Sequence, residues 1–179
     1  MAMIKNSARK IWVSVFPWMG PLLLFSIVWS GSWAESGPWT RLDQGLYMGE
    51  FKPTKKSEIC DRNITILKID PKFFAFKLLC ASEHDRKART VREWATEFGL
   101  VAATNAGMYQ GADFLKSTGF MKNYKHVNNP YFNRSFGAFL VFNPADPSLP
   151  EVQIIDRRLQ KNWRSLIKRY NTVIQNYRM

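Results

Sequence analysis

The sequence has 179 residues, 46% of them apolar, and a formal charge of +12 at pH 7. This length and apolar content suffice for one packed domain, so the composition excludes a largely disordered chain. The basic excess favours anionic partners such as phosphorylated or acidic glycans. Nucleic acid is the weakest candidate, because the basic residues are dispersed and do not gather in one arm or on one helix face.

Residues 1–34 have the pattern of a secretory signal. Three basic residues precede a charge-free apolar stretch over residues 11–29, and Ser32 and Ala34 are the small residues that a signal peptidase recognises. We expect cleavage after Ala34 and export of residues 35–179 to the periplasm or the extracellular space. The alternative is an uncleaved membrane anchor, because a stretch of about 19 apolar residues just spans a bilayer.

Export changes the interpretation of the two cysteines, Cys60 and Cys80. Outside the cytoplasm two cysteines usually pair, and closing a loop of about 20 residues stabilises a fold by roughly 3 kcal/mol. We therefore expect a Cys60–Cys80 disulfide, with two buried thiols as the alternative. A cysteine protease is disfavoured, since neither cysteine has a Gly-rich or His-proximal context.

The first predicted strands lie in the N-terminal half of the exported part. A short strand is expected over residues 46–51. Residues 63–70 alternate in polarity, Asp70 and Pro71 predict a turn, and residues 73–81 form a second apolar run. We expect these two runs to pair as an antiparallel hairpin, which would bring the two cysteines close together.

A helix is predicted after this hairpin. Residues 83–89 mix charges of both signs and are expected to form a solvated turn. Thr90 and Glu93 then have the spacing of a capping box, an apolar stripe follows at helical spacing, and Gly99 supplies a stop. Residues 100–104 are short and apolar, which predicts a buried strand.

The last third of the chain is rich in predicted strands. We expect Asp156 to cap a helix over residues 159–170, whose apolar face begins at Leu159. The strands are expected over residues 119–123, 135–143, 151–156 and 171–175, with a polar segment over residues 124–134.

Most familiar catalytic and cofactor motifs are excluded. Ala112 follows Gly111 where a P-loop needs lysine, and no Gly-x-Ser-x-Gly elbow occurs. The only histidines, His84 and His126, are 42 residues apart and are expected to be surface or hydrogen-bonding residues, so we expect no metal site and no cofactor. A carboxylate pair would have to draw on Asp113 and Glu83, although spacing selects neither.

Residues 105–119 combine groups that suit a sugar phosphate. Asn105 offers a donor and an acceptor, Gly107 permits a close backbone approach, and Tyr109 offers a stacking face. Lys116 and Thr118 can meet a phosphate oxygen. Because this stretch follows a predicted buried strand, we expect it to be a ligand-facing loop, with a plain turn as the alternative.

Several segments resemble, in order, the phosphodiester glycosidase family. The matched residues are Asn105, Ala106, Gly107, Met108 and Tyr109, then Thr118, Gly119 and Phe120, then Asn128, Asn129, Gly137, Ala138 and Phe139. The resemblance runs from about Gly45 to the C-terminus. Family members continue into a second half, so residues 35–179 look like the N-terminal portion of a truncated domain.

The resemblance implies an α+β fold with a mixed, largely antiparallel sheet, incomplete in this chain. It implies hydrolysis of a glycosyl phosphodiester in an envelope glycan or exopolysaccharide. Asn105 would orient the sugar, and Asp113 is the acid/base candidate. Gly107, Tyr109, Lys116, Thr118, Gly119 and Asn129 are the expected substrate-binding residues. The alternative is a non-catalytic glycan-binding module or an inactive remnant.

Overall fold

The computed structural model describes residues 2–6, 37–54 and 63–178. The chain divides into two compact units, one formed by residues 1–7 with 70–179 and the other by residues 8–69. The described parts of both are rich in antiparallel strands with little helix, so the expected α+β class is confirmed. The predicted signal segment lies outside the described residues except at residues 2–6.

The described part of the smaller unit is a three-stranded antiparallel sheet. Its order is β2 (Trp39–Asp43), β3 (Leu46–Phe51) and β4 (Ile64–Ile69). Gly49 of β3 permits the rings of Trp39 and Phe51 to meet edge to face at 5.3 Å, because a Cβ there would lie 2.8 Å from Phe51. The strand expected over residues 46–51 is confirmed.

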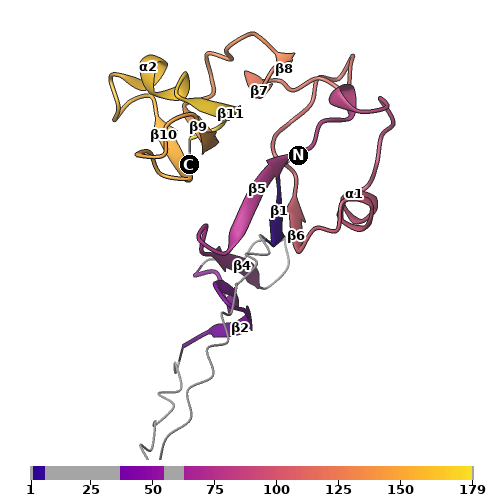
Figure 1. Ribbon diagram of the computed structural model, residues 1–179, viewed down its shortest axis with the longest axis vertical. Coiled ribbons are helices and arrows are strands. Elements are labelled where there is room, and N and C mark those ends of the chain that lie inside the picture. The colour runs from indigo at the N-terminus through magenta and orange to yellow at the C-terminus, as the bar shows by residue number, and fades with distance from the viewer. Residues whose placement is uncertain (1, 7–36, 55–62, 179) are drawn as a thin grey trace, which may run out of the picture. The chain divides into compact units, whose positions relative to one another are not determined.

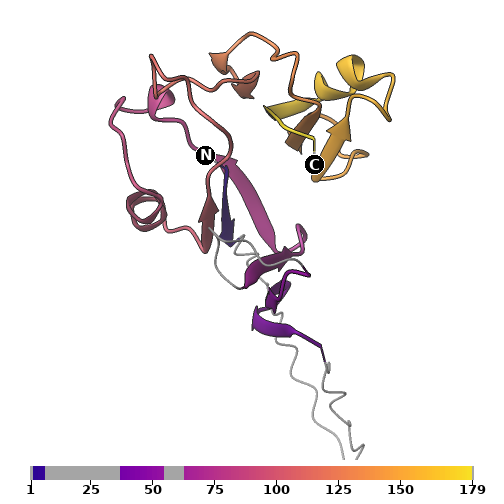
Figure 2. The same cartoon turned by 180° about the vertical axis from the view of Figure 1, so that it is seen from behind.

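The first sheet of the larger unit has β1 (Ala2–Asn6) between β5 (Phe74–Leu78) and β6 (Ala102–Thr104). β1 is antiparallel to both neighbours, and the two ribbon views show it between them (Figures 1 and 2). Phe74 and Leu78 of β5 are buried, as its predicted apolar face requires.

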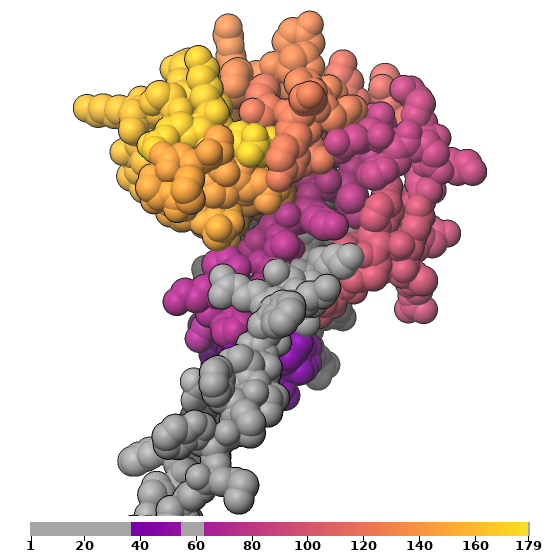
Figure 3. All heavy atoms as spheres, viewed as in Figure 1, coloured from indigo at the N-terminus to yellow at the C-terminus, as the bar shows by residue number. Residues whose placement is uncertain are grey.

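The second sheet of the larger unit contains five strands. Their order is β10 (Val152–Asp156), β9 (Ala138–Pro144), β11 (Tyr170–Asn176), β7 (Met121–Asn123) and β8 (His126–Asn129), with every neighbour antiparallel. In the space-filling view the atoms of the last part of the chain, coloured amber to yellow, lie together at the upper left (Figure 3). β11 is central, and Thr172, Val173, Ile174 and Gln175 are all buried.

Two buried clusters hold the five-stranded sheet. One joins its strands to the first sheet through Leu78, Cys80 and Met121. The other packs the helix α2 (Trp163–Ile167) against the sheet, with the rings of Trp163 and Phe139 stacked at 5.1 Å. Burial of these large side chains is the main favourable contribution to folding.

The helix α1 (Val91–Glu97) begins as predicted. The Thr90 hydroxyl accepts from the Glu93 amide at 3.3 Å, and the Glu93 carboxylate accepts from the Thr90 amide at 2.6 Å. The hydrogen bonds from Thr90 lower the pKa of Glu93. Gly99 has φ +57°, the left-handed conformation that ends a helix at low cost. A 3-10 turn, η1 (Ala81–Glu83), lies between β5 and α1.

The strands expected around residues 63–70 and 73–81 exist, but their pairing was predicted wrongly. β4 pairs with β3, whereas β5 pairs with β1. The turn at Asp70 does form, with the Phe73 amide donating to the Asp70 carbonyl at 3.1 Å. The hairpin argument for a Cys60–Cys80 disulfide therefore fails, and the disulfide stays a prediction because Cys60 lies outside the described residues.

Other local predictions also need correction. β8 lies within the polar segment over residues 124–134, for which no strand was predicted, and β6 is half-buried where a buried strand was expected. Helix α2 is shorter than predicted, and Leu159 is 75% exposed. Asp156 does not cap α2, because it ends β10 and its carboxylate accepts from the Arg158 amide and pairs with Arg178. Neither described helix is long and apolar enough to cross a bilayer.

Candidate ligand-binding site

A cavity of about 550 Å³ lies beside the loop that follows β6. Its volume is typical of a small-molecule site. Residues of the loop line it together with residues near β5 and from α1. The lining consists of Leu79, Cys80, Ala81, Ala88, Arg89, Thr90, Val91, Trp94, Asn105, Gly107, Met108, Tyr109, Phe114, Leu115, Lys116, Ser117, Met121 and Asn128.

The loop is held in shape by its own backbone. The Gln110 amide donates to the Lys116 carbonyl, and the Thr118 amide donates to the Met108 carbonyl, each at 2.9 Å. Tyr109 and Ser117 form an isolated antiparallel bridge. The loop is therefore a narrow, hydrogen-bonded turn that presents side chains from a fixed backbone.

Two asparagines of β8 anchor the loop from outside. Asn128 accepts from the Ser117 amide at 2.7 Å and donates to the Leu115 carbonyl at 2.7 Å. Asn129, buried to 2% exposure, donates to the Ser117 carbonyl at 2.8 Å. Because buried backbone groups without partners are costly, these side-chain amides stabilise the loop at Leu115 and Ser117.

Four of the predicted catalytic and substrate-binding residues line the cavity: Asn105, Gly107, Tyr109 and Lys116. Asn105 is exposed, and Tyr109 is 63% exposed. Within the described part of the chain, the side chains of Asn105 and Lys116 make no hydrogen bond or ion pair. They therefore keep their polar groups available for a ligand.

The other predicted binding residues do not line the cavity. The Thr118 hydroxyl donates to the Met108 carbonyl at 3.2 Å, and Asn129 anchors Ser117. Gly119 is in a tightly packed place, because a Cβ there would lie 2.7 Å from Phe136 Cδ2 and 2.8 Å from the Gln175 carbonyl oxygen. In the described structure, Thr118 and Asn129 therefore stabilise the loop by hydrogen bonds, and Gly119 permits its close packing.

The two carboxylates considered for acid/base chemistry lie outside the lining. Asp113 is exposed, and its carboxylate accepts from the Leu115 amide at 3.0 Å. The Glu83 carboxylate accepts from Nδ2 of the Asn123 side chain at 2.8 Å. No described acidic residue lines the cavity, and the described residues hold no group of three metal-ligating side chains.

Arg89 is a cavity residue that the sequence analysis missed, since its segment was expected to be a solvated turn. Its guanidinium pairs with Asp85 and Glu97, each at 2.7 Å, and lies 4.7 Å from the centroid of the Trp94 ring. Hydrogen bonding from Arg89 holds the pKa of Asp85 well below its usual range, and Asp85 in turn raises the pKa of Arg89. The i, i+4 spacing of Asp85 and Arg89 was the available signal.

Cys80 and two polar side chains complete the surroundings. The Cys80 Sγ lies 3.9 Å from the Met121 Sδ, and burial raises the pKa of its thiol. The Ser82 hydroxyl lies 3.0 Å from Nε2 of His126 and accepts from Asn128 at 2.8 Å. His126 is thus a hydrogen-bonding residue, as expected.

Comparison of the chain with protein-family models, curated proteins and solved structures finds no match.

Proposed function

We propose that this protein is exported and hydrolyses glycosyl phosphodiesters, with the sugar phosphate held in the cavity beside residues 105–117. The observation that carries the proposal is the meeting of Asn105, Tyr109 and Lys116 at one cavity. An amide, an aromatic ring and an ammonium group together suit a sugar that bears a phosphate.

Each group has a distinct role in this proposal. The Asn105 amide hydrogen-bonds a sugar hydroxyl, the Tyr109 ring packs against the sugar face, and Lys116 compensates phosphate charge. Water adds to the anomeric carbon, the bond between that carbon and the phosphate oxygen breaks, and the phosphate leaves with the bonding electrons. The proton that the water loses passes to the solvent. A phosphate leaving group needs little protonation, so a general acid contributes less here than with an alkoxide leaving group.

The test is release of sugar by the purified chain from UDP-N-acetylglucosamine, whose hydrolysis gives N-acetylglucosamine and UDP. We expect Asn105→Ala to lower kcat/KM by up to about tenfold, as loss of one hydrogen bond to a neutral sugar hydroxyl does. Asn162→Ala is the matched control, because Asn162 is exposed and its side chain makes no capping hydrogen bond. Equal release by the Asn105→Ala variant would remove Asn105 from the mechanism.

A non-catalytic glycan-binding module is the second candidate. It is favoured by the absence of an acidic side chain among the described residues that line the cavity. On this alternative the chain binds a phosphorylated glycan without turnover. Calorimetric binding of N-acetylglucosamine-1-phosphate with no sugar released from the diester supports it, whereas sugar release that depends on Asn105 excludes it.

A further inference from the structure

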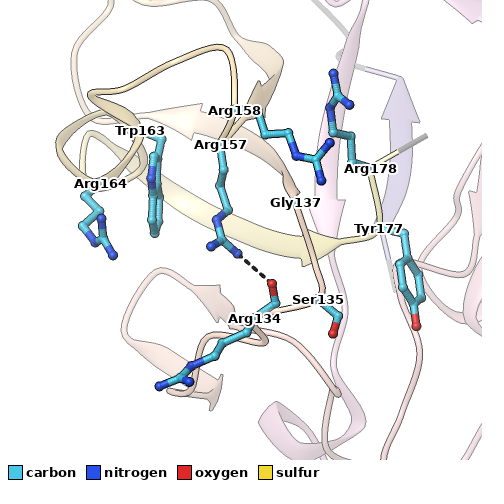
Figure 4. Close-up of a pocket in the computed structure, with 9 residues that line it drawn as sticks. All are labelled: Arg134, Ser135, Gly137, Arg157, Arg158, Trp163, Arg164, Tyr177 and Arg178. Carbon is cyan, nitrogen blue, oxygen red and sulfur yellow. Dashed lines mark hydrogen bonds between the residues drawn. The ribbon is translucent and has the colours of Figure 1, made fainter.

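A second cavity, separate from the first in its lining residues, gathers arginine side chains. It has a volume of about 480 Å³ and lies beside β10, α2 and the end of β11. Its lining residues, drawn in Figure 4, are Arg134, Ser135, Gly137, Arg157, Arg158, Trp163, Arg164, Tyr177 and Arg178. Five of these nine residues are arginine. The nine lining residues are spread over 45 positions of the sequence.

Two of the arginines are held in place by the fold. The Arg157 guanidinium donates to the Phe136 carbonyl at 2.8 Å and to the Arg134 carbonyl at 3.4 Å, the contact drawn in Figure 4. Arg178 pairs with Asp156, and Gly137 permits its close approach because a Cβ there would lie 3.0 Å from the Arg178 Cβ. These contacts fix the position of two positive charges before any ligand arrives.

The other three arginines leave their charge available. Arg134, Arg158 and Arg164 are exposed, and none of them pairs with a carboxylate of the described residues. The Arg164 guanidinium lies 4.4 Å from the centroid of the Trp163 ring, and Figure 4 shows this ring between the side chains of Arg157 and Arg164. Stacking on an aromatic ring orients a guanidinium without neutralising it.

The charge balance of this cavity favours an anion. Five guanidinium groups line the cavity, and among the described residues only that of Arg178 has a carboxylate partner, Asp156, so the like charges repel one another. A doubly charged oxyanion relieves this repulsion and accepts bidentate hydrogen bonds from arginine. The exposed Tyr177 ring at the cavity offers an apolar surface to the group that carries the anion.

We propose that this cavity binds a phosphate or sulfate group carried on a small molecule or a glycan. The site is distinct from the cavity beside residues 105–117 and does not rest on the proposed hydrolase activity. Cavity size favours a compact ligand over an extended polyanion.

The test uses the full chain with inorganic phosphate, sulfate and chloride at matched ionic strength. We expect phosphate and sulfate, at about ten times their dissociation constant, to raise Tm by about 3 °C, while chloride does not. Arg158→Gln combined with Arg164→Gln should remove this rise. Arg92→Gln, an exposed arginine of α1 outside this cavity, is the matched control and should keep it.

Further arms of the experiment identify the source of the anion and keep the test independent of folding. Arg134→Gln replaces one exposed residue, so it tests the site even if the double variant does not fold. It should weaken phosphate binding, measured by calorimetry, at least threefold. Glucose 6-phosphate should compete with phosphate, and unphosphorylated glucose should not.

Four outcomes overturn the proposal: an equal rise in Tm with chloride, a rise retained by the folded double variant, unchanged affinity in Arg134→Gln, or binding to anionic lipid vesicles that phosphate does not displace. Lys116→Ala, which removes the proposed phosphate contact of the first cavity, should leave the response to inorganic phosphate intact, so failure here is distinguishable from failure of the proposed hydrolase.

Discussion

The side-chain amide of Gln175 bonds the backbone of Asn133 in both directions. The Asn133 amide donates to Oε1 at 2.9 Å, and Nε2 donates to the Asn133 carbonyl at 2.8 Å. The same amide accepts from the Phe120 amide and donates to the Phe136 carbonyl. One buried side chain of β11 thereby holds both the end of the 105–119 loop and the segment that carries Arg134.

Replacement of Gln175 by Leu should destabilise the fold strongly. The change keeps the volume but leaves the backbone amides of Phe120 and Asn133 without partners, which costs about 2–4 kcal/mol in total, whereas the Phe136 carbonyl keeps its hydrogen bond from Arg157. Urea unfolding of the full chain measures the free energy of unfolding. Gln44→Leu, at the exposed turn after β2, is the control and should change it by less than about 0.5 kcal/mol. A similar effect of both variants would contradict the role given to Gln175.

Two glycines of one loop should respond oppositely to alanine. At Gly119 the added Cβ meets the Phe136 ring at 2.7 Å and the Gln175 carbonyl at 2.8 Å, so we expect a loss of about 1–3 kcal/mol. At Gly111 the Cβ meets no atom within 4 Å, and alanine there should be neutral or slightly stabilising. Thermal unfolding of both variants compares them directly, and equal Tm values would refute the packing argument.

Lys116 should contribute to binding of the phosphorylated sugar and not to folding. We expect Lys116→Ala to weaken binding of N-acetylglucosamine-1-phosphate about tenfold, because a charge-assisted hydrogen bond is lost, and to leave Tm unchanged. Lys125→Ala is the control, since Lys125 is exposed and does not line the cavity. If both lysine variants bind equally well, Lys116 is not a ligand contact.

Acid should remove a contribution that Asp146 makes to the free energy of unfolding. Hydrogen bonds from Ser148 and from Arg169 lower the pKa of this carboxyl from 3.8 to about 2. Because the folded-state pKa lies below the unfolded value, the contribution is present above pH 4 and is lost as the pH falls towards 2. In Asp146→Asn and in Arg169→Gln, Tm should fall less steeply between pH 4 and 2. An unchanged slope in both variants would show that the pair does not couple folding to pH.

Mass spectrometry after alkylation distinguishes a Cys60–Cys80 disulfide from two thiols. Alkylation of the unfolded, unreduced chain should label neither cysteine if the predicted disulfide forms, and both if they are thiols. In the second case Cys80 should react slowly in the folded chain, because it is buried and its thiol pKa is raised.

Local patterns predicted local structure well. The capping box of Thr90 and Glu93 and the left-handed Gly99 set the ends of α1, because their hydrogen bonds lie within a few residues. Alternation in polarity identified β4, and short apolar runs identified β3 and β5. Of the site, the cluster of Asn105, Tyr109 and Lys116 could be predicted because all three lie on one short loop.

Strand pairing and the second cavity could not be predicted in this way. The chain alone shows that β4 and β5 are strands on either side of a turn, and that arginines occur at scattered positions. The pairing partner of each strand depends on which apolar faces are buried by distant segments. The hydrogen bonds between Gln175 and Asn133 depend on the same long-range packing. Arg134, Arg158 and Arg178 meet because β9, β10 and β11 are neighbours in one sheet, and sheet order is decided by nonlocal hydrogen bonding and core packing.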